Sequence, residues 1–211
     1  KAEVEVVKKE KDSDHVLEGA VFALCAKEDI TGADGKVILK ADTVIEELAT
    51  DKEGKLTFTA DLPIGFAYYI KETSPASGFA TTDEIQEFTF EYEGAEKEKV
   101  SYAFTFEDEP TVIEITKTSL TDGKELEGAK LQVTDESGKV VDSWTSGKEA
   151  HIIKELVVGQ KYTLTETKPA DGFVTAESIT FTVKDNAEAQ KIEMKDDVTK
   201  VEISKTDISG K

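Results

Sequence analysis

The sequence predicts an all-β protein made of two tandem antiparallel β-sandwiches. Three observations predict this fold class: weak helical periodicity, short runs of alternating apolar and polar residues, and turn residues between those runs. The turn segments include residues 32–35 and 135–138, which contain Gly and Asp. Short strands at regular spacing are typical of sandwiches. Besides the repeated segments described next, strand-like runs cover residues 20–25, 55–60, 87–92, 139–144 and 178–183.

Several segments recur along the chain and indicate tandem domains. A strand-like run that ends in Lys occurs at residues 4–8, 113–117 and 201–205, and only Val7 breaks its alternation. Leu-Glu-Gly-Ala occurs at 17–20 and 126–129, with its Gly eleven residues after the Lys in both copies. The segments 68–79 and 162–173 align without a gap, each with a strand, a Glu and a Pro-to-Gly-Phe turn. Finally, residues 104–110 resemble residues 192–198.

The repeats predict two complete domains and the beginning of a third. We expect the first domain at residues 1–110 and the second at 111–199, with residues 200–211 as the first strand of a truncated repeat. The first domain is longer between its Lys and its Glu, which predicts an extra hairpin around residues 35–50. We expect residues 206–211 to be poorly fixed, because their partner strands are missing.

Composition restricts the function and the surroundings of the protein. The 211 residues carry a net charge of −19, and all 26 basic residues are Lys, so nucleic acid is not expected as a partner. A hydrophobic content of 38% is enough to build cores, but no stretch is long enough to span a membrane. The single Cys25 excludes an intrachain disulfide. Because the chain opens without an apolar signal segment, we expect an internal piece of a longer protein. We also expect this piece to be monomeric.

Six ionisable residues end apolar strand faces in matched positions. Side chains alternate between the two faces of a strand, so Lys8 shares a face with Val4 and Val6, and the same rule applies to the other strands. Lys9 follows directly, but the spacing to the Leu-Glu-Gly-Ala segment favours Lys8 as the inward residue. The residues in question are Lys8, Glu72 and Asp108 in the first domain, and Lys117, Glu166 and Asp196 in the second.

Buried ionisable groups must pair, become neutral or react, because an unpaired buried charge costs several kcal/mol. Burial lowers the pKa of an amine and raises that of a carboxyl group, so neutral forms of both come within reach near neutral pH. A neutral lysine amine is a nucleophile, and a neighbouring Glu can transfer protons. These residue types therefore predict an amide bond between side chains, with loss of water. The alternative is a buried salt bridge that never reacts.

These motifs resemble the CnaB-type, or SpaA-type, domains of Gram-positive surface adhesins and pilins, which are Ig-like β-sandwiches. The resemblance covers nearly the whole chain. It implies an autocatalytic isopeptide bond between the first and last strands, assisted by a Glu. Carried over by motif, the crosslinks are Lys8 to Asp108 and Lys117 to Asp196, with Glu72 and Glu166 as the catalytic residues. The family's acceptor is most often Asn, whereas both domains here have Asp, which makes water the leaving group.

The resemblance implies a structural stalk or spacer in a cell-wall-anchored, extracellular protein, with neighbouring repeats of the same chain as partners. A crosslink of this kind would join the strands where a pulling force enters and leaves. The crosslink from Lys8 to Asp108 would close a loop of 100 residues. On the chain-entropy model, closing a loop of that length contributes roughly 4.7 kcal/mol to stability. An enzyme acting on external substrates is not predicted, because the sequence has no nucleophile elbow, phosphate loop or metal motif.

The main alternative function is a ligand-binding adhesin module that contacts a host extracellular matrix protein or a glycan. Its surface would use aromatic residues, namely Phe66, Tyr68, Tyr69 and Trp144. In a β-sandwich, such residues are more often part of the core. No cofactor or metal is expected, since the sequence has two His and no EF-hand spacing of acidic residues. Cys25, in an apolar run, is expected to be an unreactive core or rim thiol.

Overall fold

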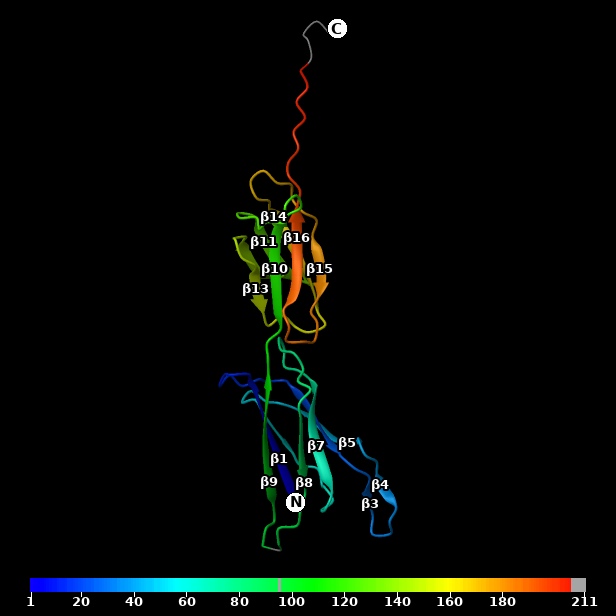
Figure 1. Ribbon diagram of the computed structural model, residues 1–211. Helices are drawn as coiled ribbons and strands as arrows, with labels where there is room; N and C mark the ends of the chain where they lie inside the picture. Colours follow the sequence, from blue (N-terminus) through cyan, green and yellow to red (C-terminus); the bar gives the residue numbers. More distant parts are fainter. Residues whose placement is uncertain (95, 206–211) are drawn as a thin grey trace. The chain divides into compact units, whose positions relative to one another are not determined.

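The computed structural model describes residues 1–94 and 96–205, and in these residues all regular structure is β-strand (Figure 1). This confirms the predicted all-β class. The chain divides into two compact units, of which the first contains Lys1–Thr111 with the short segments Lys154–Val158 and Lys184–Glu188. The first domain consists of β1 (Ala2–Glu10), β2 (Val21–Ala26), β3 (Ile30–Thr31), β4 (Val37–Leu39), β5 (Val44–Ala49), β6 (Lys55–Phe58), β7 (Ala67–Ser74), β8 (Ile85–Thr89) and β9 (Val100–Asp108). The second consists of β10 (Val112–Ser119), β11 (Lys130–Asp135), β12 (Val140–Thr145), β13 (His151–Lys154), β14 (Lys161–Lys168), β15 (Ile179–Thr182) and β16 (Gln190–Asp196).

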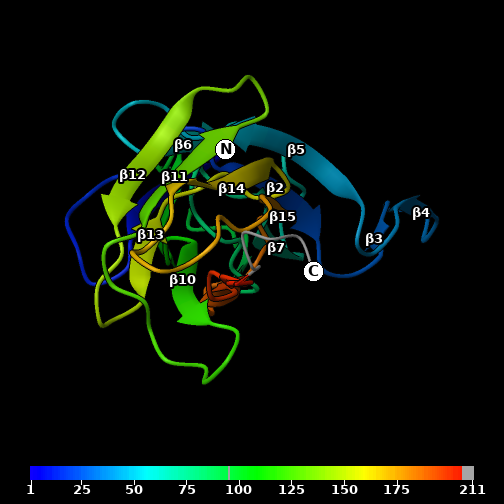
Figure 2. The same ribbon diagram turned by 90° about the horizontal axis from the view of Figure 1, so that it is seen from above.

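Each domain is a sandwich of a three-stranded and a four-stranded sheet. In the first domain the strand orders are β6-β1-β9 and β5-β2-β7-β8, and in the second they are β13-β10-β16 and β12-β11-β14-β15. Figure 2 shows β12, β11 and β14 of the second domain side by side. The first and last strands of each domain, β1 with β9 and β10 with β16, pair in parallel, whereas the other registered pairs are antiparallel. This pairing is a parallel exception to the antiparallel arrangement expected from the sequence.

The core of each domain follows from the period of two in its strands. In β1, residues Ala2, Val4, Val6 and Lys8 are buried, and the residues between them are partly exposed. Residues from β1, β2, β7 and β9 meet in one apolar cluster between the two sheets. The predicted alternation is therefore correct, and it carries a lysine into the core at the end of β1.

The predicted insertion is present, but it lies earlier in the chain than expected. The extra hairpin is β3 paired with β4, which spans residues 30–39 rather than 35–50. Gly35 forms its turn with a φ of 76°, and the hairpin extends from the sandwich beside one end of β5 (Figure 1). Residues Val44–Ala49 instead form β5, which pairs with β2 as β12 pairs with β11. Sequence spacing thus indicated an insertion but not where it begins.

The repeated Leu-Glu-Gly-Ala segment holds the end of the lysine strand. The backbone N–H of Leu17 donates to the carbonyl of Lys8, and the N–H of Leu126 donates in the same way to Lys117. A hydroxyl side chain at the end of the neighbouring strand accepts from the Ala of the segment, Thr50 in the first domain and Ser146 in the second. The equal spacing between Lys and Gly in the two copies thus accompanies the same backbone hydrogen bond in both domains.

Gly54 approaches the same strand end and provides a first prediction. It has a φ of 68°, and a Cβ there would lie 2.8 Å from the carbonyl oxygen of Lys8 and 2.7 Å from the Cβ of Val16. Gly54→Ala should therefore destabilise the first domain by about 2 kcal/mol or more in denaturant unfolding. Gly35→Ala is the matched control, since Gly35 also has a positive φ but no atom within 4 Å of its Cβ position. Equal losses in both variants would contradict the clash.

Residues 201–205, predicted as the first strand of a third repeat, lie outside any strand in the structure. Val201 and Ile203 are 75% and 90% exposed. A strand needs a partner to satisfy its backbone groups, so the alternating pattern alone does not form one here. The expectation that residues 206–211 are poorly fixed concerns residues outside the described part of the chain. Within that described part, no helix is long and apolar enough to cross a membrane.

Candidate functional site

The three residues singled out in the first domain come together between its two sheets. Lys8 lies near the end of β1 and Asp108 ends β9, so both belong to the three-stranded sheet. In the parallel register, Lys8 is opposite Phe106, which places Asp108 two residues further along the same face. Glu72 reaches the pair from β7 of the facing sheet. The long lysine side chain therefore extends diagonally toward the end of the last strand.

In the first domain the lysine amine contacts both carboxyl groups. Lys8 Nζ donates a hydrogen bond to Oδ1 of Asp108 and lies 3.1 Å from Oε1 of Glu72. All three side chains are 0% exposed. Lys9 points to the other side, where it pairs with Asp14 at 3.7 Å and is 32% exposed. The structure thus places Lys8, and not Lys9, at the inward position.

Burial dominates the electrostatics of these carboxyl groups. Removal from water raises the pKa of Glu72 to about 7, although the nearby Lys8 acts in the opposite direction. Burial likewise raises the pKa of Asp108, opposed by its hydrogen bond from Lys8. Burial therefore favours the protonated form of each carboxyl group.

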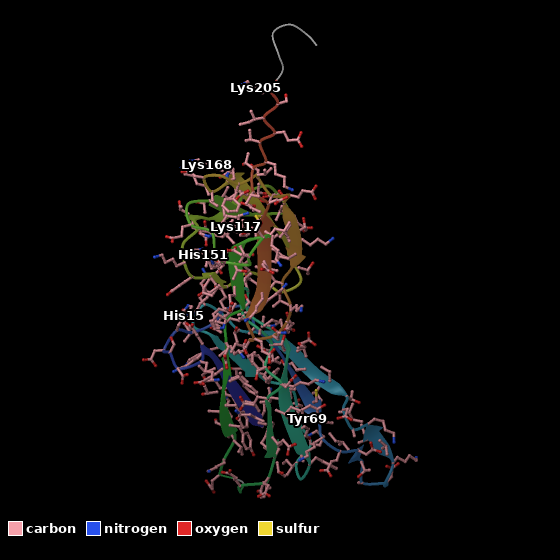
Figure 3. The ribbon with its side chains drawn as sticks, turned by 45° about the horizontal axis from the view of Figure 1, so that its top comes forward. His15, Tyr69, Lys117, His151, Lys168 and Lys205 are labelled. Atoms are coloured by element: carbon pink, nitrogen blue, oxygen red, sulfur yellow. The ribbon has the colours of Figure 1, made fainter. Side chains whose placement is uncertain are left out.

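The second domain repeats this geometry with its own residues. Lys117 on β10 donates a hydrogen bond to Oδ1 of Asp196 at the end of β16, and its Nζ lies 3.0 Å from Oε1 of Glu166 on β14. The side chain of Lys117, labelled in Figure 3, is 2% exposed. Burial raises the pKa of Asp196, and the neighbouring Glu166 adds to this effect. In register, Ser119 is opposite Asp196, which matches the offset in the first domain.

Each Glu is held by a backbone amide that the sequence did not point to. Oε2 of Glu72 accepts from the N–H of Thr82 at 2.8 Å, and Oε2 of Glu166 accepts from the N–H of Ala176 at 2.8 Å. In both domains the donor lies ten residues after the Glu. The strand paired with each Glu strand also shifts its register next to the Glu, which marks a β-bulge. In the first domain this shift lies beside Phe22, the residue opposite Glu72. A main-chain donor leaves no residue type by which sequence reasoning could recognise it.

Four buried side-chain oxygens have no hydrogen-bond partner among the described residues. They are Oε1 of Glu72 and Glu166 and Oδ2 of Asp108 and Asp196. Although each Oε1 is close to a lysine amine, it lies outside hydrogen-bond geometry, so the amine is directed at the aspartate instead. A buried acceptor without a donor is costly, and this cost favours the protonated form of these carboxyl groups.

The surroundings of the two lysines differ. Nζ of Lys8 lies 5.4 Å from the centroid of the Phe22 ring, and this ring packs on Phe106 with 4.9 Å between centroids. At the corresponding register positions the second domain has Leu131, opposite Glu166, and Met194, opposite Lys117. Leu131 and Met194 therefore stand in the second domain where the first domain has the aromatic residues Phe22 and Phe106.

The other residues considered from the sequence lie apart from these sites. Cys25 is fully buried in a small cluster with Ala23 and Tyr69, which places it in the core, and burial raises the pKa of its thiol. Tyr68 is a core residue of the first domain. Trp144 stacks on His151 with 4.0 Å between centroids, and His151 contacts Asp142 at 2.8 Å. Within residues 1–94 and 96–205, no group of His, Cys, Asp and Glu could hold a metal ion.

Comparisons with known proteins agree with this fold. The Bacillus anthracis TIE protein is 24% identical over 93% of this chain, with a TM-score of 0.53, and the match covers 34% of that protein's chain. This chain thus spans about a third of the TIE protein. A C-terminal fragment of the pilus adhesin SpaC from Lactobacillus rhamnosus GG is 16% identical, with a TM-score of 0.51 and coverage of 97% of this chain and 100% of the fragment. At these identities the likeness establishes the fold. Comparison with curated proteins gives no match.

A family model identifies both domains. The SpaA model, described as a prealbumin-like fold domain, matches residues 2–103 and again residues 111–198. The two matches together cover most of the sequence, and each includes the lysine strand of its sandwich. The chain therefore belongs to the SpaA family of prealbumin-like fold domains, present here as two tandem copies.

Proposed function

We propose that this chain is a structural stalk segment of an extracellular surface protein, and that an intramolecular isopeptide bond locks each domain. The bonds join Lys8 to Asp108 and Lys117 to Asp196. One observation carries the proposal: in both domains a buried lysine amine is hydrogen-bonded to the aspartate of the last strand. A salt bridge in this position would leave a buried ion pair with unpartnered oxygens, whereas an amide removes both charges.

The bond forms by condensation of an amine with a carboxylic acid. In the first domain, Lys8 loses a proton to the carboxylate pair, and its neutral Nζ then attacks Cγ of Asp108. The C–O bond to one carboxyl oxygen breaks, and that oxygen leaves as water. Glu72 carries the proton from the attacking nitrogen to the leaving oxygen, which is a general acid–base role. The raised pKa values of Asp108 and Glu72 support the required protonation near neutral pH.

The arrangement of the crosslinks favours a load-bearing role over turnover of an external substrate. Each proposed bond connects the first strand of a domain to its last strand, which are the strands that receive and pass on a pulling force. Membership of the SpaA family and the fold shared with a pilus adhesin fragment support a place in a surface fibre. We expect neighbouring repeats as partners and a cell-wall-anchored location. Each site reacts once and is not an enzyme.

Intact mass measured in denaturant tests the proposal directly. The chain should weigh less than its sequence mass by two water molecules, because each condensation releases one. Replacing both glutamates, Glu72→Ala with Glu166→Ala, should restore the full sequence mass, since the proton transfer is then lost. Each single variant should weigh one water molecule less than its own sequence mass, because only the domain that keeps its glutamate reacts. A full sequence mass for the unsubstituted chain would show that both sites are unreacted salt bridges.

The adhesin alternative receives less support from the positions of the aromatic residues. Tyr68 and Tyr69 are 0% and 8% exposed, and Phe66 packs against the core of the first domain. Trp144 is partly buried and stacks on His151. A ligand-binding platform needs exposed aromatic faces, so these residues serve the packing of the sandwiches.

A further inference from the structure

An aromatic ring lies beside the lysine amine of the first site. The ring of Phe22, on β2, lies directly across from Glu72 in register and is fully buried. Its centroid is 5.4 Å from Nζ of Lys8, within the range in which a ring face attracts a cation. This attraction stabilises the ammonium form of the amine and does not stabilise the neutral form. It is stronger in a site without water.

The second site offers the natural comparison, because it keeps the reactive groups and changes the lining. The ionisable groups that face Lys8 are Glu72 on β7 and Asp108 on β9, and the groups that face Lys117 are their counterparts on β14 and β16. The same types of ionisable residue therefore face the amine in both sites. The position of Phe22 is taken by Leu131, which has no ring to hold an ammonium group.

We propose that Phe22 slows crosslinking of the first domain by holding the Lys8 amine as an ammonium ion, and that Leu131 allows the second domain to react first. This inference rests on the proposed function. The affected step is the proton loss that precedes bond formation: the ammonium gives its proton to the carboxylate pair, the nitrogen bonds to Cγ of Asp108, and the displaced oxygen leaves as water. A ring that favours the ammonium form lowers the population of attacking amine. Phe22 itself forms no bond in this reaction and acts only through the amine of Lys8.

The rates can be measured on the full chain, starting from unreacted protein. Protein from inclusion bodies is dissolved in urea, its full sequence mass is verified, and refolding is started by dilution. Samples are quenched at intervals and digested, and the two crosslinked peptides are quantified separately by mass spectrometry. The second domain should crosslink roughly tenfold faster than the first. Phe22→Leu should bring the first domain close to the rate of the second, and Leu131→Phe should slow the second by a similar factor.

A series of fluorinated phenylalanines at position 22 separates the effect of the ring from that of packing. Fluorine withdraws electron density from the ring face and changes its size little, so the crosslinking rate of the first domain should rise with each added fluorine. The second domain in the same chain reports on general folding. Rates unchanged by fluorination, or slower crosslinking in Phe22→Leu, would overturn this inference while leaving the bonds themselves in place. If neither domain loses water, both this inference and the proposed function are wrong.

Discussion

Replacing Lys8 with alanine will release about 340 Å of additional contour length when the protein is pulled from its two ends, whereas the unsubstituted first domain will release none. The proposed bond encloses the chain between Lys8 and Asp108, which are 100 residues apart. An extended chain spans about 3.4 Å per residue, so this segment is the source of the extra length. The corresponding variant of the second domain, Lys117→Ala, frees 79 residues and about 270 Å.

The physical reason lies in the parallel pairing of the first and last strands. Force enters β1 at its N-terminal end and leaves β9 at its C-terminal end, and in a parallel pair these are opposite ends. The pair is therefore loaded in shear, and the crosslink lies close to the exit. Tension passes along β1, through the amide and out after Asp108, so the strands from β2 to β8 carry none of it. Without the amide, only hydrogen bonds and packing resist.

Single-molecule force spectroscopy with handles at both termini measures these lengths. Lys9→Ala is the matched control, since Lys9 lies on the same strand but points away from the site. The control should behave as the unsubstituted chain and show no unfolding step from the first domain. Two unfolding steps of about 340 and 270 Å in the unsubstituted chain would mean that neither bond exists.

The sequence predicted most of the fold because the fold rests on local periodicity and on repetition. The alternation in residues 4–8 was sufficient to place Val4, Val6 and Lys8 on the buried face, as observed. Comparing two copies in one chain replaced an alignment, and it distinguished Lys8 from Lys9 by the spacing to Gly19. What the sequence could not give was the start of the inserted hairpin, because Val44–Ala49 reads equally well as part of the insertion or as β5.

The sequence predicted the ionisable side chains of the candidate site, but not the main-chain groups and cross-sheet contacts around them. Face alternation pointed to the lysine, the glutamate and the aspartate, and the structure brings these together in each domain. The amides of Thr82 and Ala176 that hold the glutamates are main-chain groups, so no residue pattern marks them. The contact between Phe22 and Lys8 depends on how the two sheets face each other, which is a tertiary property. Period and spacing define what lies on one strand but not what lies across the sandwich.

Replacing Lys8 with methionine will make the first domain most stable in acid and progressively less stable as the pH rises. Methionine fills a similar volume but removes the cation that opposes the effect of burial on Glu72 and Asp108. The pKa of Glu72 is about 7 even with Lys8 present, and that of Asp108 is also raised. Without the amine, the charge that lowers these pKa values is gone, so the pKa of each carboxyl group in the folded state rises further.

The sign follows from the protons bound in each state. In the unfolded chain these carboxyl groups ionise near pH 4, whereas in the folded domain the pKa of Glu72 is raised to about 7 and that of Asp108 is also raised. The folded state thus binds more protons between these limits, and the free energy of unfolding falls by about 1.4 kcal/mol per pH unit for each such carboxyl group. Stability is fully present below the unfolded pKa and is lost as the pH passes through the folded pKa.

Denaturant unfolding of the Lys8→Met chain at pH 5, 6, 7 and 8, followed by circular dichroism, measures this slope. Lys9→Met removes the same charge from the same strand outside the site, so the general repulsion in a chain of net charge −19 affects both variants alike. The difference between the two variants should therefore grow with pH. A constant difference would show that Glu72 and Asp108 ionise in the folded domain as they do in water, and it would remove the protonated carboxyl group on which condensation with an aspartate depends.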